Sequence, residues 1–269
     1  MGKNNTREEA YRLPLSYILR FILAVLLGRR RELGRDAGGT LMTARPKPKI
    51  LDDQHIPSEG PFVFVANHYE RPGLKVWWGG MLAATAIYER RQSQRTLRWL
   101  MTSEWYNFRL AGVIPVPTWL LRWLFRRIAN VYGLVIVPRS PGRRVGRAAA
   151  VRFILDVVER RSEPIGLYPE GVGREVLIEA MPGTGLFLSS LSRRGIPILP
   201  CGVYEEEGVL TARFGPPFFI DVPRAAAKEE RDRLAREQVM ARIGRLLPRP
   251  MWGPYTLAIE QLLARGPVA

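Results

Sequence analysis

The chain contains 269 residues, of which 46% are hydrophobic, so it can bury one large core or at most two small ones. Its formal net charge of +16 predicts an anionic partner: a phospholipid surface, a phosphorylated metabolite or nucleic acid. A single cysteine, Cys201, excludes an internal disulfide and a cysteine-based metal cluster, and we interpret it as a small buried hydrophobe. Because only His55 and His68 can supply imidazole, we predict neither a metal site nor a bound cofactor.

The first apolar segment, Leu13–Gly28, contains Arg20 near its middle and is followed by three arginines, Arg29 to Arg31. It is short and charged for a membrane span, and arginines stand where a signal peptide needs a small-residue cleavage site. For residues 1–33 we predict an amphipathic helix that lies in or dips into one leaflet, with its basic end on anionic headgroups at the cytoplasmic face. The alternative is a helix packed on the protein's own core.

Residues 34–48 are rich in glycine and end in Pro-Lys-Pro, which predicts a linker before a single domain at 49–269. In this domain, strand-like runs alternate with helical patterns. We expect strands at Lys49–Leu51, Phe62–Ala66, Leu97–Met101, Leu134–Val137, Ile165–Tyr168, Ile196–Val203 and Val209–Phe214. We expect helices at Leu74–Arg91, Trp119–Ala129, Arg144–Arg161, Gly185–Arg194, Arg224–Leu247 and Tyr255–Ala264. This alternation predicts an α/β three-layer sandwich with a mixed, mostly parallel sheet.

Two of the expected strands end in polar residues. The run Phe62–Ala66 stops at Asn67 and His68, and a later apolar run stops at Pro169-Glu170-Gly171. In an open α/β sheet, side chains at the carboxyl ends of parallel strands converge on one crevice. The sequence therefore predicts that His68 and Glu170 face the same site.

Further motifs follow in a recognisable order. Asn67-His68 is followed by Gly133–Arg139 (GLVIVPR), Tyr168–Gly171 (YPEG) and Ile196–Pro200 (IPILP). Together they resemble the four blocks of the glycerophospholipid acyltransferase family, the lysophosphatidate (1-acylglycerol-3-phosphate) acyltransferase-like enzymes. Phe214–Pro217, followed by Ile220-Asp221, is similar to that family's strand after the fourth block. The resemblance covers roughly residues 45–247 and implies the same three-layer fold.

The resemblance implies a membrane-associated acyltransferase of phospholipid biosynthesis and lipid metabolism. Such an enzyme moves a fatty acyl group from acyl-CoA or acyl carrier protein to a hydroxyl of a lysophospholipid or related glycolipid, with His68 as general base. The residues that it implies for substrate binding are Asn67, Arg139, Glu170, Gly171, Arg174, Pro197 and Pro200. The expected partners are thus an anionic membrane, a lipid acceptor and the acyl donor. Nucleic acid is not expected, because no recognition module accompanies the charge.

The chain departs from the family pattern at two places. Where the family has an aspartate five residues after its histidine, this chain has Gly73, and after Gly171 it reads Val-Gly-Arg instead of Thr-Arg-Ser. Glu70 is a candidate to replace the aspartate, because residues two apart share a face of an extended segment. A helical turn would instead separate Glu70 from His68, and Asp52 and Asp53 are further candidates.

These departures leave a second reading open. If no carboxylate replaces the aspartate, Glu70 is a loop residue paired with one of the many arginines. The chain is then a catalytically weak or inactive relative that binds lipid or a protein partner through the same scaffold.

Overall fold

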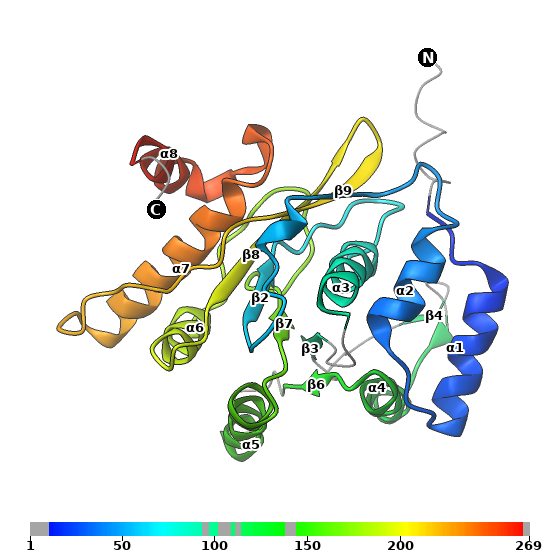
Figure 1. Cartoon of the computed structure of the whole chain (residues 1–269). Coiled ribbons are helices and arrows are strands. Elements are labelled where there is room, and N and C mark those ends of the chain that lie inside the picture. The colour runs from blue at the N-terminus through cyan, green and yellow to red at the C-terminus, as the bar shows by residue number, and fades with distance from the viewer. Residues whose placement is uncertain (1–10, 93–96, 102–108, 111–113, 138–143, 266–269) are drawn as a thin grey trace.

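The computed structural model describes residues 11–92, 97–101, 109–110, 114–137 and 144–265. Its centre is a seven-stranded sheet with helices on both faces, which confirms the predicted α/β sandwich (Figure 1). Neighbouring strands are parallel except β8 and β9, which form an antiparallel pair. The strand order across the sheet is β1 (Lys49–Leu51), β9 (Val209–Phe214), β8 (Ile198–Glu206), β2 (Val63–Ala66), β7 (Ile165–Leu167), β3 (Arg98–Met101) and β6 (Val135–Ile136).

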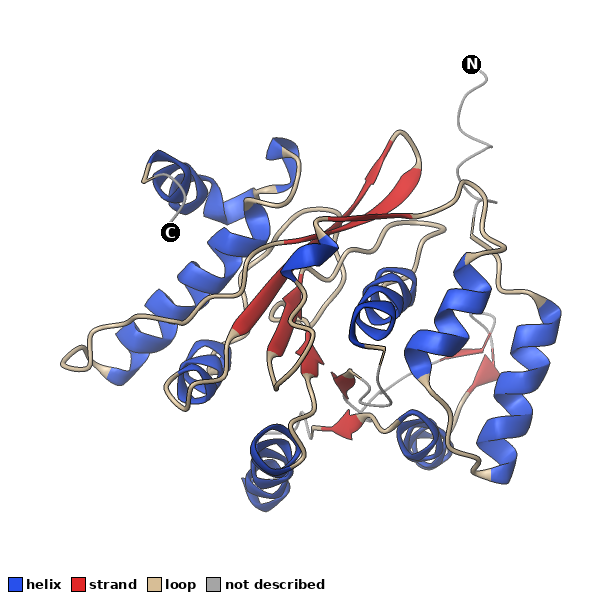
Figure 2. Cartoon of the chain, in the orientation of Figure 1, coloured by secondary structure: helices blue, strands red, loops and turns tan. Residues whose placement is uncertain are grey.

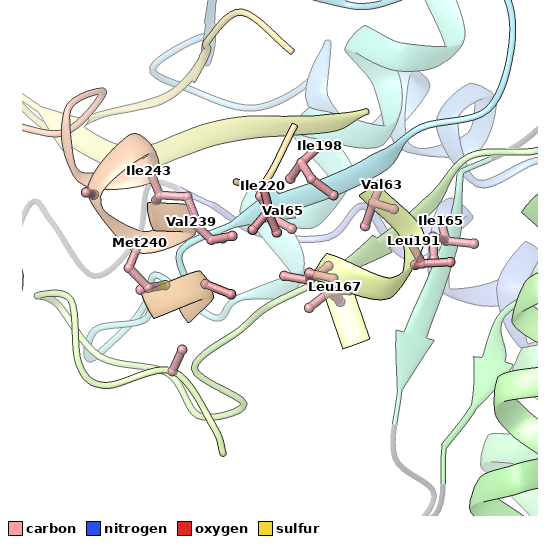
Figure 3. Close-up of a cluster of buried hydrophobic side chains, with 14 of the residues drawn as sticks. Val63, Val65, Ile165, Leu167, Leu191, Ile198, Ile220, Val239, Met240 and Ile243 are labelled. Carbon is pink, nitrogen blue, oxygen red and sulfur yellow. The ribbon is translucent and has the colours of Figure 1, made fainter. Parts of the chain in front are cut away.

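Alternating side chains of the central strands supply two separate cores. Phe64 and Ala66 of β2 pack with helices α2 (Leu33–Leu41) and α3 (Trp77–Arg91) on one face. Val63 and Val65 point to the opposite face, which is shown in close-up in Figure 3. There they pack with helices α6 (Thr184–Ser192), α7 (Lys228–Gly244) and α8 (Thr256–Ala264). Cys201 is fully buried in the first core, as the sequence predicts.

The remaining described elements connect or flank this sandwich (Figure 2). Helix α5 (Arg144–Leu155) continues as one π-helical turn over Asp156–Arg160, close to the helix expected at Arg144–Arg161. A two-stranded antiparallel hairpin, β4 (Arg109–Leu110) and β5 (Ile114–Pro115), is an element that the sequence analysis did not predict. Three short 3-10 turns occupy Asp53–His55, Arg249–Met251 and Gly253–Tyr255.

The predicted linker is the main correction to the domain prediction. Much of residues 34–48 is the helix α2, which packs against α3. A Cβ atom at Gly34 would lie 2.4 Å from Cβ of Tyr88, and one at Gly38 would lie 3.3 Å from a methyl of Thr85. The glycines are therefore spaced one helical turn apart because two helices approach closely there, and they do not mark a flexible segment.

The N-terminal helix α1 (Leu15–Leu27) packs on α4 (Thr118–Tyr132) at one end of the molecule (Figure 1). Its inner face buries Ala24 and Val25, and the ring of Phe21 stacks on Tyr132 with centroids 6.3 Å apart. Its outer face leaves six large apolar side chains exposed: Leu15, Leu19, Ile22, Leu23, Leu26 and Leu27. Among the described residues, no helix combines the length and apolar character needed to cross a bilayer.

Candidate functional site

The segment after β2 is extended, and alternate residues bind opposite neighbours. The side-chain amide of Asn67 pairs with the backbone of Val203, donating to its carbonyl at 2.8 Å and accepting from its N–H at 2.7 Å. Tyr69 donates a hydrogen bond to the Glu205 carboxylate at 3.1 Å, and Arg71 forms a two-pronged ion pair with the same carboxylate. These three side chains attach the segment to Val203 and Glu205 in the second half of β8. His68 and Glu70 therefore face the other way.

The backbone of His68 is held by the turn that follows β7. The N–H of His68 donates to the Glu170 carboxylate at 2.5 Å, and its carbonyl accepts from the N–H of Arg174 at 3.0 Å. The second carboxylate oxygen of Glu170 accepts the N–H of Ile178 at 2.9 Å. Burial raises the pKa of the Glu170 carboxyl to about 7, although both N–H donors oppose the rise. Glu170 thus contacts His68 through the backbone N–H of His68 and not through its ring.

The imidazole of His68 is half-buried against aromatic rings. The ring meets that of Tyr168 edge to face at 4.7 Å between centroids, and Tyr168 in turn stacks on Trp99 at 4.8 Å. Burial lowers the pKa of His68 below its ordinary value, and the nearby charge of Glu70 opposes this effect. The ring is therefore neutral at pH 7, which is the form that accepts a proton. Its Nδ1 is buried and has no hydrogen-bond partner among the described residues.

Glu70 is the described carboxylate that shares a face with His68. A Cβ atom placed on Gly173 would lie 2.9 Å from Nδ1 of His68 and 2.9 Å from Oε2 of Glu70. The two atoms are therefore at most twice that distance apart, and a side chain at position 173 would collide with both residues. The other carboxylate oxygen, Oε1, accepts an ion-paired hydrogen bond from Lys75 at 2.6 Å. His68 and Glu70 can lie this close to residue 173 because it is a glycine.

Gly73, which the resemblance aligns with an aspartate, belongs to a tight turn. Arg71 and Leu74 exchange two backbone hydrogen bonds, of 3.1 Å and 3.0 Å, around Pro72 and Gly73. Gly73 has φ 80°, in the left-handed region that glycine favours, and proline suits the position before it. The backbone conformation thus explains why a glycine stands here.

The other predicted binding residues are not all at the site. Gly171 closes the turn after β7 with φ 68°, and Arg174 is exposed next to the His68 backbone. Pro200 is buried in β8 beside Val65. The carbonyl of Pro197 accepts the N–H of Val63 at 2.9 Å, at the amino end of the sheet and thus at the end opposite His68. Arg139 lies outside the described residues.

Two alternatives to Glu70 are not near the histidine. Asp52 forms an ion pair with Arg213 at 2.7 Å, and Asp53 is exposed in the turn after the edge strand β1. His55, in the same turn, points its Nδ1 at the carbonyl of Phe214, 3.0 Å away. The edge strand is three places from β2 in the sheet, so these residues do not join His68.

Three residues of the site were missed by sequence reasoning: Lys75, Gly173 and Glu205. Lys75 and Glu205 are single charged residues without a motif, and their roles depend on partners that the fold brings near. Gly173 had a sequence indication, since it stands where the family that the chain resembles has a larger residue, but its closeness to both His68 and Glu70 required coordinates.

Two open hollows lie away from His68. One, of 560 Å³, lies between α1 and α2, and the other, of 600 Å³, lies beside α4 and the end of β6. A scan of the sequence against protein-family models finds no match, and a search of curated proteins finds none either.

Proposed function

We propose that the chain is a peripheral membrane acyltransferase that transfers a fatty acyl group from a thioester to a hydroxyl of a lipid or glycolipid, with His68 as general base. The observation that carries the proposal is the environment of His68. A neutral imidazole with a lowered pKa lies at the carboxyl end of a central strand, next to the Tyr168–Gly171 turn and a carboxylate on its own face. These are the properties of a positioned base.

The reaction needs two proton transfers, and one histidine can perform both. The acceptor hydroxyl oxygen attacks the thioester carbonyl carbon while its proton passes to the free ring nitrogen of His68. As the tetrahedral intermediate collapses, the carbon–sulfur bond breaks and the imidazolium returns the proton to the thiolate. The products are an ester and the free thiol of CoA or acyl carrier protein. A negative charge beside Nδ1 stabilises the imidazolium that forms between the two steps.

Glu70 is our candidate for that charge. One of its oxygens is held by Lys75, and the other lies beside Gly173 on the side where Nδ1 of His68 lies. A side-chain movement that brings this oxygen to Nδ1 gives the ring a hydrogen-bond acceptor that fixes its tautomer. The exposed cations Lys75 and Arg174 lie beside the same segment, and we propose that they attract the phosphate of an acceptor.

A second candidate function has its own supporting observation. The Nδ1 atom of His68 has no acceptor in the described part of the chain, and the position of the family's aspartate is a turn glycine. Loss of the orienting carboxylate costs a serine protease about 10⁴ in rate, a value from that enzyme and not from this chain. The second candidate is therefore a relative that binds lipid or a partner with little catalysis.

Acyl transfer from acyl-CoA or acyl carrier protein to a panel of lysophospholipids and glycolipids tests the proposal. We expect His68→Ala to lower the rate by about 10²–10⁴, as loss of a general base does. His55→Ala is the control and should keep most of the activity, because His55 lies in another turn. No transfer by the wild-type chain to any acceptor would favour the second candidate.

Glu70→Gln tests the stand-in carboxylate. We expect the rate to fall by roughly 10²–10⁴ if Glu70 orients the imidazole. Glu175→Gln removes a charge from an exposed neighbour and serves as the matched control. A Glu70→Gln rate within about threefold of wild type, which is under 1 kcal/mol in barrier height, contradicts this role.

We also propose that α1 holds the protein on the bilayer. Its outward face is apolar, the reverse of a helix that covers a soluble core. Replacing Leu19, Leu23 and Leu26 by serine should reduce flotation with anionic vesicles by about a hundredfold, at roughly 1 kcal/mol for each partly inserted side chain. The control replaces exposed apolar residues outside α1, namely Phe219 and, from α8, Leu257 and Leu263. Equal loss in both variants would refute the assignment.

A further inference from the structure

Four arginines line the hollow between α1 and α2. Arg20 enters it from α1, Arg30 and Arg31 from the turn between the helices, and Arg35 from α2. Hydroxyl groups complete the lining, from Ser16, Tyr17, Thr40 and Thr43. With a volume of 560 Å³ and an open mouth, the hollow has room for a polar headgroup.

The two acidic residues that line this hollow, Glu32 and Asp36, already have hydrogen-bond or ion-pair partners. Asp36 forms a two-pronged ion pair with Arg31 and accepts a hydrogen bond from Tyr132 at 3.1 Å. Glu32 caps the first turn of α2 by accepting the N–H of Gly34 at 3.3 Å. Arg20, Arg30 and Arg35, by contrast, are exposed and have no acidic partner among the residues that the structure describes. Three uncompensated guanidinium groups around one concavity repel one another, and an anion relieves that repulsion.

The position of the hollow indicates which anion it takes. Its arginine from α1, Arg20, belongs to the helix whose outer face exposes Leu19 and Leu23. A helix that lies in the interface with those leucines among acyl chains brings its polar flank to the level of the headgroups. Guanidinium groups bind phosphate through paired N–H donors. The adjoining apolar face thus favours a phosphate attached to a lipid over a free one.

We propose that the hollow between α1 and α2 binds the phosphate-bearing headgroup of an anionic phospholipid, with Arg20, Arg30 and Arg35 as its ligands. The inference rests on the proposed membrane association of α1 and is independent of acyl transfer. It assigns two roles within the N-terminal segment: the leucines insert among the acyl chains, and the three arginines bind anionic headgroups.

The test measures partitioning of the full chain onto vesicles of neutral phosphatidylcholine, with or without phosphatidic acid. The triple variant Arg20→Gln, Arg30→Gln, Arg35→Gln should lose about a hundredfold in partitioning to the anionic vesicles, at roughly 1 kcal/mol for each basic residue near such a surface. Its partitioning to neutral vesicles should not change. The matched control, Arg193→Gln, Arg224→Gln, Arg265→Gln, alters net charge equally at exposed positions that adjoin α6, α7 and α8 and should lose less than threefold.

Each other outcome overturns the inference in a recognisable way. Equal losses in the two triple variants would mean that overall charge, and not the hollow, attracts the membrane. If inorganic phosphate raises the melting temperature of the wild type but not of the hollow variant, while vesicle binding is the same for both, the site takes a soluble phosphate. Failure of the wild type to bind any vesicle would refute the membrane role itself, whether or not the chain transfers acyl groups.

Discussion

The buried carboxyl of Glu170 makes stability depend on pH in a direction that can be worked out. Its pKa is raised from the ordinary 4.5 to about 7, so the folded protein binds this proton more tightly than the unfolded chain does. The contribution of this group to the free energy of unfolding is therefore complete below pH 4.5 and declines as the pH rises to about 7. Each pKa unit corresponds to about 1.4 kcal/mol, so the rise from 4.5 to about 7 amounts to roughly 3 kcal/mol.

Glu170→Gln isolates this contribution, because glutamine does not titrate. The variant retains an oxygen for one of the two backbone donors, His68 and Ile178, and leaves the other facing an amide NH₂ group, a cost of about 1–3 kcal/mol. Urea denaturation followed by circular dichroism at pH 4 to 8 gives the unfolding free energy of both proteins. The wild-type value minus the variant value should fall by about 3 kcal/mol across this range.

The lowered pKa of His68 has the opposite effect, because the unfolded chain binds this proton more tightly than the folded protein does. Its contribution therefore makes the folded protein more stable as the pH rises toward 6.5. That contribution is present in both proteins and cancels in the difference. A wild-type-minus-variant difference that changes by less than about 1 kcal/mol between pH 4 and 8 would refute the reasoning, since it would mean that burial does not keep the Glu170 carboxyl protonated.

Three further substitutions test the scaffold by chemical denaturation. Asn67→Ala should cost about 2–4 kcal/mol, because it leaves the buried N–H and carbonyl of Val203 unpaired; a cost below 1 kcal/mol would contradict this. Asp232→Ala should cost about 2 kcal/mol, since its carboxylate accepts two N–H groups at the start of α6; an unchanged midpoint would exclude the cap. Gly73→Asp should lower stability by about 1 kcal/mol through its positive φ and should not raise acyl transfer; a more active variant would show that the turn accommodates a catalytic carboxylate.

The fold could be predicted because the strands alternate between two buried faces and end at turn formers. The strands β1 and β9 have the expected bounds. The strand β8 differs at both ends for local reasons. It begins after Pro197, which has no N–H to donate, and it extends to Glu206 because antiparallel pairing with β9 continues beyond the apolar run. A strand that continues past the buried core through backbone hydrogen bonds cannot be recognised from hydrophobicity alone.

The candidate site was only partly predictable, because a carboxylate can either accept backbone hydrogen bonds or take part in the reaction, and the sequence does not distinguish the two roles. The positions of His68 and Glu170 followed from two strand ends, yet the part played by Glu170 depends on an N–H 102 residues away in the chain. The helix α2 was mistaken for a linker because glycine suggests flexibility in a sequence, whereas here it permits close helix packing. Such contacts across the fold are not encoded in any local pattern.

The extended segment after β2 separates the support of the site from its reactive group. Asn67, Tyr69 and Arg71 fasten this segment through side chains, while His68 is fastened through its main chain alone. Exchanging the imidazole therefore leaves every one of these attachments in place. Substitution at position 68 then removes only the ring contact with Tyr168, so differences in turnover among variants with the same denaturation midpoint report chemistry and not misfolding.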